Sequence, residues 1–147
     1  MESDKELGKI LISDDDEDVL LAAKMLLRKH AENVIIEKNP KKIPFLLNND
    51  TYDVILLDMN FSKDITSGKE GFYWLEQILE REPTAVVILI TAFGDVEMAV
   101  KALKEGATDF VLKPWQNEKL IATLSSAAKL KKSRNEVTQL KQAKQAL

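Results

Sequence analysis

The sequence predicts an α/β fold in which one parallel β-sheet carries helices on both faces. Two observations predict it. Five short apolar runs rich in β-branched residues do not alternate with polar residues, which is typical of strands buried on both faces of a parallel sheet. The segments between these runs repeat their apolar residues at helical spacing. Strand and helix therefore alternate five times along 147 residues, a length that fits one ordinary domain.

The predicted strands occupy the apolar runs. Gly106 stands where the helix before the last strand must end, and Pro114 stands where the last strand must end. The strands are expected at residues 10–12, 34–36, 54–57, 86–90 and 110–112.

Four long amphipathic helices are predicted by stripes of apolar residues. A shorter helix is expected to begin at Pro40, with Asn39 as its N-cap, and to end before Asn48, although Pro44 disturbs its first turns. Tyr73 and Trp74 fall off the apolar stripe of their helix and are predicted to pack at its rim. The long stripes run over residues 19–27, 72–79, 96–103 and 120–128.

Composition excludes several classes of protein. The chain has no cysteine, so it can form neither disulfides nor thiolate metal sites, and its net charge of −3 gives no reason to expect direct nucleic-acid binding. Residues 1–7 form a polar, acidic tail, and no apolar run approaches the roughly 20 residues that a membrane span requires. We therefore expect a cytoplasmic protein without membrane contact.

Polar residues that could bind a ligand or take part in a reaction stand at the ends of four of the predicted strands. Asp14 and Asp15 follow the first, Asp58 ends the third, Thr91 ends the fourth and Lys113 ends the fifth. The carboxyl ends of parallel strands meet at one edge of the sheet, where such folds bind ligands. Neighbouring carboxylates need a compensating cation when they are desolvated, and an all-oxygen set of this kind suits Mg²⁺.

Each of these residues alone has an ordinary structural interpretation. The acidic run from Asp14 to Asp18 is typical of a solvated helix start, where carboxylates are favourable. Thr91 alone would be a strand-end hydroxyl bonded to the backbone, and Lys113 alone an exposed edge residue. Their occurrence together, in this order and at four strand ends, favours a shared site.

The segments around these residues resemble the four signatures of the response-regulator receiver domain. The resemblance covers about residues 8–128 and implies a flavodoxin-like, doubly wound five-stranded sheet of order 2-1-3-4-5. It also implies a function in two-component signal transduction, in which a sensor histidine kinase transfers a phosphoryl group to the domain. The matching segments are Ile10–Asp15, Val54–Asp58, Leu89–Ala92 and Phe110–Pro114.

The resemblance also implies a role for each site residue. Asp58 matches the phosphoacceptor, Asp15 the carboxylate that binds Mg²⁺ directly, and Asp14 its partner through metal-bound water. Asn60 would give its backbone carbonyl to the metal. Thr91 would bond a phosphoryl oxygen.

The remaining matches concern the positive charge and the switch. Lys113 would pair with the carboxylate or the phosphoryl group, and Phe110 is the aromatic residue that would rotate with Thr91 on phosphorylation. The sequence departs from the family at Ser62, where a proline is usual, and in its loop after Asp58, which is longer than is typical. The role of residues 61–70 in this loop stays open between a cover for the site, a partner contact and a tolerated insertion.

The segment from Gly94 to Trp115 further resembles the receivers of enhancer-binding transcription activators of the nitrogen-regulation type. Residues 129–147 are then expected to be a helical linker to an output domain that this chain lacks. A short heptad pattern predicts a coiled coil and a homodimer, and a solvated extension is the alternative. The seam would contain Leu130, Val137, Leu140 and Leu147.

Two other functions compete with a phosphoreceiver. A phosphatase of the haloacid-dehalogenase type requires a second aspartate two positions after its nucleophile, and this chain has Asn60 there. A receiver fold that acts only through phosphorylation-independent protein interaction usually lacks an acid of the pair, the acceptor or the lysine. All of these are present, so we expect a signalling domain that catalyses only its own phosphorylation and dephosphorylation.

Overall fold

The structure, a computed structural model, describes residues 5–59, 69–92 and 95–146. Its centre is a sheet of five parallel strands in the order β2-β1-β3-β4-β5, which confirms the predicted fold class. The strands are β1 (Lys9–Ser13), β2 (Asn33–Glu37), β3 (Val54–Asp58), β4 (Val87–Ala92) and β5 (Asp109–Lys113).

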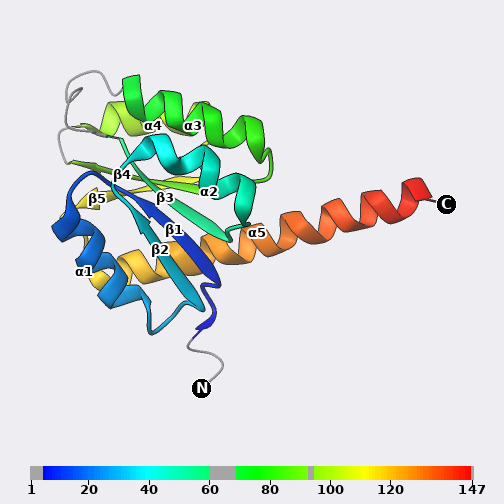
Figure 1. Cartoon of the computed structure of the whole chain (residues 1–147), viewed down its shortest axis with the longest axis horizontal. Helices are drawn as coiled ribbons and strands as arrows, with labels where there is room; N and C mark the ends of the chain where they lie inside the picture. The colour runs from blue at the N-terminus through cyan, green and yellow to red at the C-terminus, as the bar shows by residue number, and fades with distance from the viewer. Residues whose placement is uncertain (1–4, 60–68, 93–94, 147) are drawn as a thin grey trace.

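Helices cover both faces of the sheet (Figure 1). The α1 and α5 helices lie on one face and share a core with it, whereas α2, α3 and α4 lie on the other. The helices are α1 (Glu17–Leu27), α2 (Ile43–Asn49), α3 (Lys69–Arg81), α4 (Val96–Lys104) and α5 (Asn117–Ala146).

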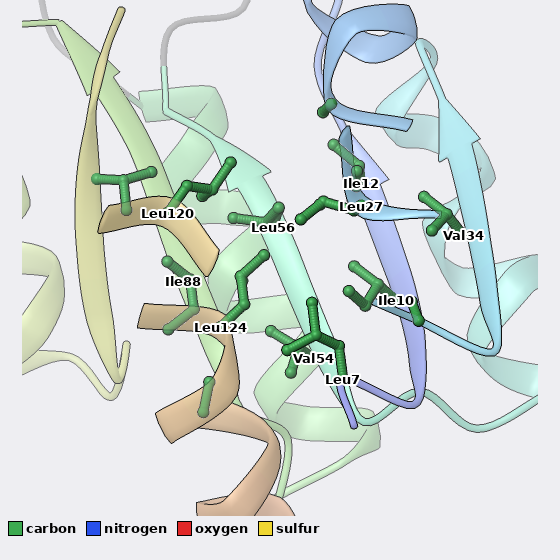
Figure 2. Packing of buried hydrophobic residues seen from close by; sticks show 14 of the residues in the cluster. Leu7, Ile10, Ile12, Leu27, Val34, Val54, Leu56, Ile88, Leu120 and Leu124 are labelled. Carbon is green, nitrogen blue, oxygen red and sulfur yellow. The ribbon is translucent and has the colours of Figure 1, made fainter. Parts of the chain in front are cut away.

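Alternation along the strands divides the core in two. Ile10 and Ile12 of β1 point toward α1 and α5, and Leu11 between them points to the opposite face. Figure 2 shows Leu120 and Leu124 of α5 against the sheet on the first of these faces. Burying a side chain of this size stabilises the fold by about 1.5–3 kcal/mol, so both faces contribute to stability.

Local sequence signals fix where several helices begin and end. The Asp16 carboxylate accepts a hydrogen bond from the Asp18 backbone N–H at 2.9 Å and thereby caps α1. The predicted helix at Pro40 is divided, because Asn39 caps a short 3₁₀ turn over Pro40–Lys42 that leads into α2. Gly106 follows α4 with a φ of 117°, a left-handed value that glycine adopts readily.

The prediction for Trp74 was wrong. Its side chain is buried in the core formed with α2, α3 and α4, and Tyr73 beside it is exposed. The apolar stripe of α3 was read as if the helix faced only the sheet. Because α3 also packs against α2, it buries a wider arc than that stripe.

The α5 helix is longer than the domain. It crosses one face of the sheet and continues past the edge where the strands begin (Figure 1). It begins at Asn117, and its 30 residues confirm the predicted extended C-terminal helix. Among the described residues, no helix combines the length and apolar character needed to cross a membrane.

Candidate functional site

The candidate site lies at the edge where the strands end. Strand register places Asp58 beside Ile90, so the end of β3 adjoins Thr91 on β4. Lys113 is paired with Ala92 at the end of β5, next to Thr91. The side chains of Asp14, Asp58 and Thr91 are fully buried. Four strands therefore bring the polar residues named from the sequence to one place.

Three carboxylates form the centre of this site. Asp14, Asp15 and Asp58 each offer a carboxylate oxygen, and these oxygens lie within 4.8 Å of one another. The Lys113 ammonium donates hydrogen bonds to Asp14 Oδ2 at 3.2 Å and to Asp58 Oδ1 at 3.4 Å. One cation thus bridges two of the three acids, and the cluster keeps an excess of negative charge.

The backbone holds Asp14 in position. The Asp16 N–H donates to Asp14 Oδ1 at 2.9 Å, and the Asp14 N–H donates to the Glu37 carbonyl at 3.2 Å. Asp16 itself is exposed and caps α1, so the acidic run divides into site residues and a helix start. This matches the ordinary structural interpretation for the exposed part of the run.

Burial and neighbouring charges have opposite effects on the pKa values of Asp14 and Lys113. Burial raises the pKa of the Asp14 carboxyl, against the Asp16 hydrogen bond and the charge of Lys113. Burial alone would lower the pKa of the Lys113 ammonium, but the charges of Asp58 and Asp14 outweigh it and the pKa rises. Lys113 is therefore a cation at neutral pH.

The donor set fits a hard divalent cation. Three carboxylates and one ammonium leave two negative charges in a buried place, and a metal ion of charge +2 would balance them. Oxygen ligands with part of the coordination left to water are what Mg²⁺ prefers. The Asn60 carbonyl, expected as a further ligand, lies outside the described residues.

The two residues expected to form the switch lie on neighbouring strands. Thr91 is fully buried, and its hydroxyl has no hydrogen-bond partner among the residues that the structure describes. A buried hydroxyl without a partner is costly and is available to a ligand oxygen. Phe110 is half-buried on β5 and packs against the core on the α4 side of the sheet.

Sequence reasoning missed Gly71, which lets α3 approach the chain just after β3. A Cβ atom built on Gly71 would lie 2.8 Å from the Met59 Cα atom, closer than side-chain carbons come in proteins. Gly71 therefore sets how near α3 lies to the residue that follows Asp58. Only the close approach of two backbones reveals this role. The loop of residues 61–70 falls almost entirely outside the described residues.

Comparison with known proteins identifies the family. The sequence profile of the response regulator receiver domain matches residues 10–125, more than half of the chain. The chain belongs to the response regulator receiver domain family. Receiver domains are signalling domains that accept phosphoryl groups in two-component systems.

Individual relatives define the family membership further. The chain is 32% identical to an NtrX-like response regulator of Rickettsia bellii over 90% of this chain and 27% of that protein. It is 31% identical to the transcriptional regulatory protein ZraR of Escherichia coli K12 over 80% of this chain and 26% of that protein. The chain thus spans about a quarter of the length of these relatives. They confirm the resemblance to regulators of the nitrogen-regulation type.

Solved structures agree with the fold. The N-terminal receiver domain of a two-component response regulator from Bacteroides fragilis superposes with a TM-score of 0.75 at 41% identity, over 82% of this chain and 96% of that chain. NtrX from Brucella abortus superposes with a TM-score of 0.80 at 25% identity, over 90% of this chain and 29% of that chain.

Proposed function

We propose that this chain receives a phosphoryl group on Asp58 in a Mg²⁺-dependent reaction and so switches an output function. The observation that carries the proposal is the buried Asp58 carboxylate, which Lys113 joins to Asp14 at the sheet edge. A fully buried carboxylate among other acids is unfavourable for folding and calls for a functional reason. Accepting a phosphoryl group beside cations is such a reason.

The chemistry needs positioning and positive charge. An Asp58 carboxylate oxygen attacks the phosphorus in line, its bond to phosphorus forms, and the bond from phosphorus to the donor breaks. Mg²⁺, when bound by Asp14, Asp15 and Asp58, would supply charge that stabilises the phosphoryl oxygens. Lys113 supplies a second positive charge and already lies at the acceptor carboxylate.

Thr91 and Phe110 would convert this reaction into a change of shape. The Thr91 hydroxyl, buried at the strand end, would donate to a phosphoryl oxygen that the free carboxylate does not offer. Phe110 is paired with Leu89, two residues before Thr91, so a shift at the end of β4 reaches it directly. A change of Phe110 rotamer would alter the surface near α4.

The partners follow from the same proposal. A sensor histidine kinase would donate the phosphoryl group, and dimerisation through the α5 extension and the receiver surface would accompany signalling. The output would be transcriptional, as the name of the transcriptional regulatory protein ZraR suggests for a relative that is about three times as long as this chain. A cytoplasmic location belongs to the same proposal, without direct nucleic-acid binding by this chain.

Phosphorylation by a small donor tests the acceptor. We expect the intact mass after incubation with acetyl phosphate and Mg²⁺ to rise by one phosphoryl group, and the rise to disappear with EDTA. The Asp58→Asn variant should not react. Asp18→Asn, an exposed aspartate of α1, is the matched control and should react as the parent does. Unchanged labelling of the Asp58→Asn variant would refute the assignment and favour an interaction module or another acceptor.

A further inference from the structure

Two basic residues of α5 form hydrogen bonds with the turn that leads into β4, at the edge of the sheet opposite to the site. The Lys131 ammonium donates to Thr84 Oγ1 at 2.9 Å and to the Thr84 carbonyl at 3.4 Å, and lies 3.6 Å from Glu82 Oε2. The Arg134 guanidinium donates to the carbonyls of Ala85 at 3.1 Å and Thr84 at 3.4 Å. We call this group of contacts the α5 clasp.

The burial of Lys131 distinguishes it from the neighbouring lysines of the same helix. Lys131 is only 5% exposed, whereas Lys129 and Lys132 on the same helix are exposed. Burying an ammonium costs more than burying an apolar side chain of the same length, even when it is paired. In some proteins, buried polar groups fix one geometry among several. The buried ammonium of Lys131 is a candidate for such a role.

Arg134 marks the point where the helix leaves the domain. Just before it, Leu130 packs against the core between α5, α1 and the sheet. Beyond it, every residue from Asn135 to Lys144 is exposed. The first exposed turns border a cavity of about 340 Å³ whose lining also includes the residues just before β3. Among the described residues of this stretch, none belongs to the hydrophobic core.

We propose that Lys131 and Arg134 are positioning residues that set the direction in which the C-terminal helix leaves the domain. Specific donors on two successive turns of α5 meet fixed backbone carbonyls, so the helix can neither roll nor slide without losing them. The clasp holds the residues before β4, and Thr91 lies at the other end of the same strand. The inference does not depend on the proposed phosphorylation.

Distances between spin labels test the proposal. The chain contains no cysteine, so cysteines introduced at Lys144 and at a reference position can be labelled alone. Met25 on α1 and Phe45 on α2 are exposed references on opposite faces of the sheet. Ten residues of helix separate Arg134 from Lys144, about 15 Å at 1.5 Å per residue, so a tilt of about 20° moves the label by about 5 Å. Dilution with unlabelled chain restricts the signal to distances within one molecule.

We expect narrow distance distributions in the parent and a broadening or shift of about 5 Å in the Lys131→Met, Arg134→Met double variant, as the tilt estimate gives. The Lys129→Met, Lys132→Met control should match the parent. The urea midpoint of the Lys131→Met single variant should stay level or rise, because an apolar side chain replaces a buried ion. A purely stabilising contact would instead lower that midpoint and leave the distances unchanged.

A second variant approaches the clasp from its other side. Thr84→Val keeps the shape of the side chain and removes the hydroxyl that accepts from Lys131. It should broaden the same distributions, and it serves as the test if the double variant fails to fold. Parent-like distributions in both variants would overturn the proposal.

Discussion

Replacing Asp14 with asparagine should stabilise the metal-free protein. Asp14 is fully buried, and its carboxylate lies within 4.8 Å of carboxylate oxygens of Asp15 and Asp58. Asparagine keeps the size of the side chain and an oxygen that can accept the Asp16 N–H. The substitution therefore removes a charge with little change in packing.

The expected gain follows from the distances. At an effective dielectric constant of about 20, two unit charges at the 4.8 Å upper limit of these separations repel by about 3.5 kcal/mol, so two such neighbours cost Asp14 about 7 kcal/mol. Attraction to the Lys113 ammonium at 3.2 Å returns about 5 kcal/mol on the same scale. The net cost of the charge is about 2 kcal/mol. For a domain of this size, that corresponds to a rise in melting temperature of roughly 4 to 8 °C.

Urea denaturation with and without Mg²⁺ measures this gain. In EDTA the Asp14→Asn variant should unfold at higher urea than the parent. Added Mg²⁺ should stabilise the parent, because a ligand that binds only the folded state shifts unfolding by mass action, and should stabilise the variant much less. The same assay thus measures both the stability lost through the Asp14 charge and the stabilisation that Mg²⁺ binding provides.

The control is Asp16→Asn, which removes an exposed carboxylate two residues away. Asparagine caps helices about as well as aspartate, so this variant should keep the stability of the parent. A metal-free Asp14→Asn protein that is less stable than the parent would refute the reasoning. It would show that the Lys113 and Asp16 contacts outweigh the repulsion among the acids.

Three further outcomes are expected. Burial raises the pKa of the Asp14 carboxyl in the folded state above its ordinary 3.8, so protonation of Asp14 favours the folded state. The parent should therefore lose stability relative to the Asp14→Asn variant as the pH rises through the folded-state pKa. Urea midpoints of both proteins over a pH series measure this difference. Asp15→Ala should weaken Mg²⁺ binding far more than Asp16→Ala in a tryptophan fluorescence titration, and equal losses would contradict a direct-ligand role. Val137→Asp with Leu140→Asp should reduce self-association in sedimentation experiments, since both side chains are exposed on the α5 extension.

The sheet and the meeting of the site residues were predictable because they depend on short-range pattern and topology. Buried parallel strands can be recognised as apolar runs in the sequence. Because the carboxyl ends of these strands lie at one edge of the sheet, Asp58, Thr91 and Lys113 come together there regardless of how the helices pack. The order of the strands came from the family resemblance. Pattern alone established the alternation of strand and helix.

What escaped prediction depends on how helices pack against one another. Trp74 is buried because α2 covers part of α3, and Gly71 matters because two backbones nearly touch. In the sequence, Lys131 is one of several lysines on a polar helix, and only the path of α5 across the sheet places it against Thr84. Such contacts join elements far apart in sequence, and no periodicity within one helix encodes them.

The heptad pattern and the clasp use different residues of the α5 helix. Leu130, expected in the seam, already packs against the domain core, which leaves Val137 and Leu140 exposed in the described part of that seam. At 3.6 residues per turn, Leu140 points about 180° away from Lys131, whereas Val137 lies within about 20° of the direction of Leu130, farther along the helix than the core contact. Because Val137 and Leu140 both follow Arg134 and are exposed, a partner helix that covered them would leave the contacts of the clasp in place. Lys131→Met should leave the oligomeric state unchanged, and substitutions of Val137 and Leu140 should leave the distances within one chain unchanged.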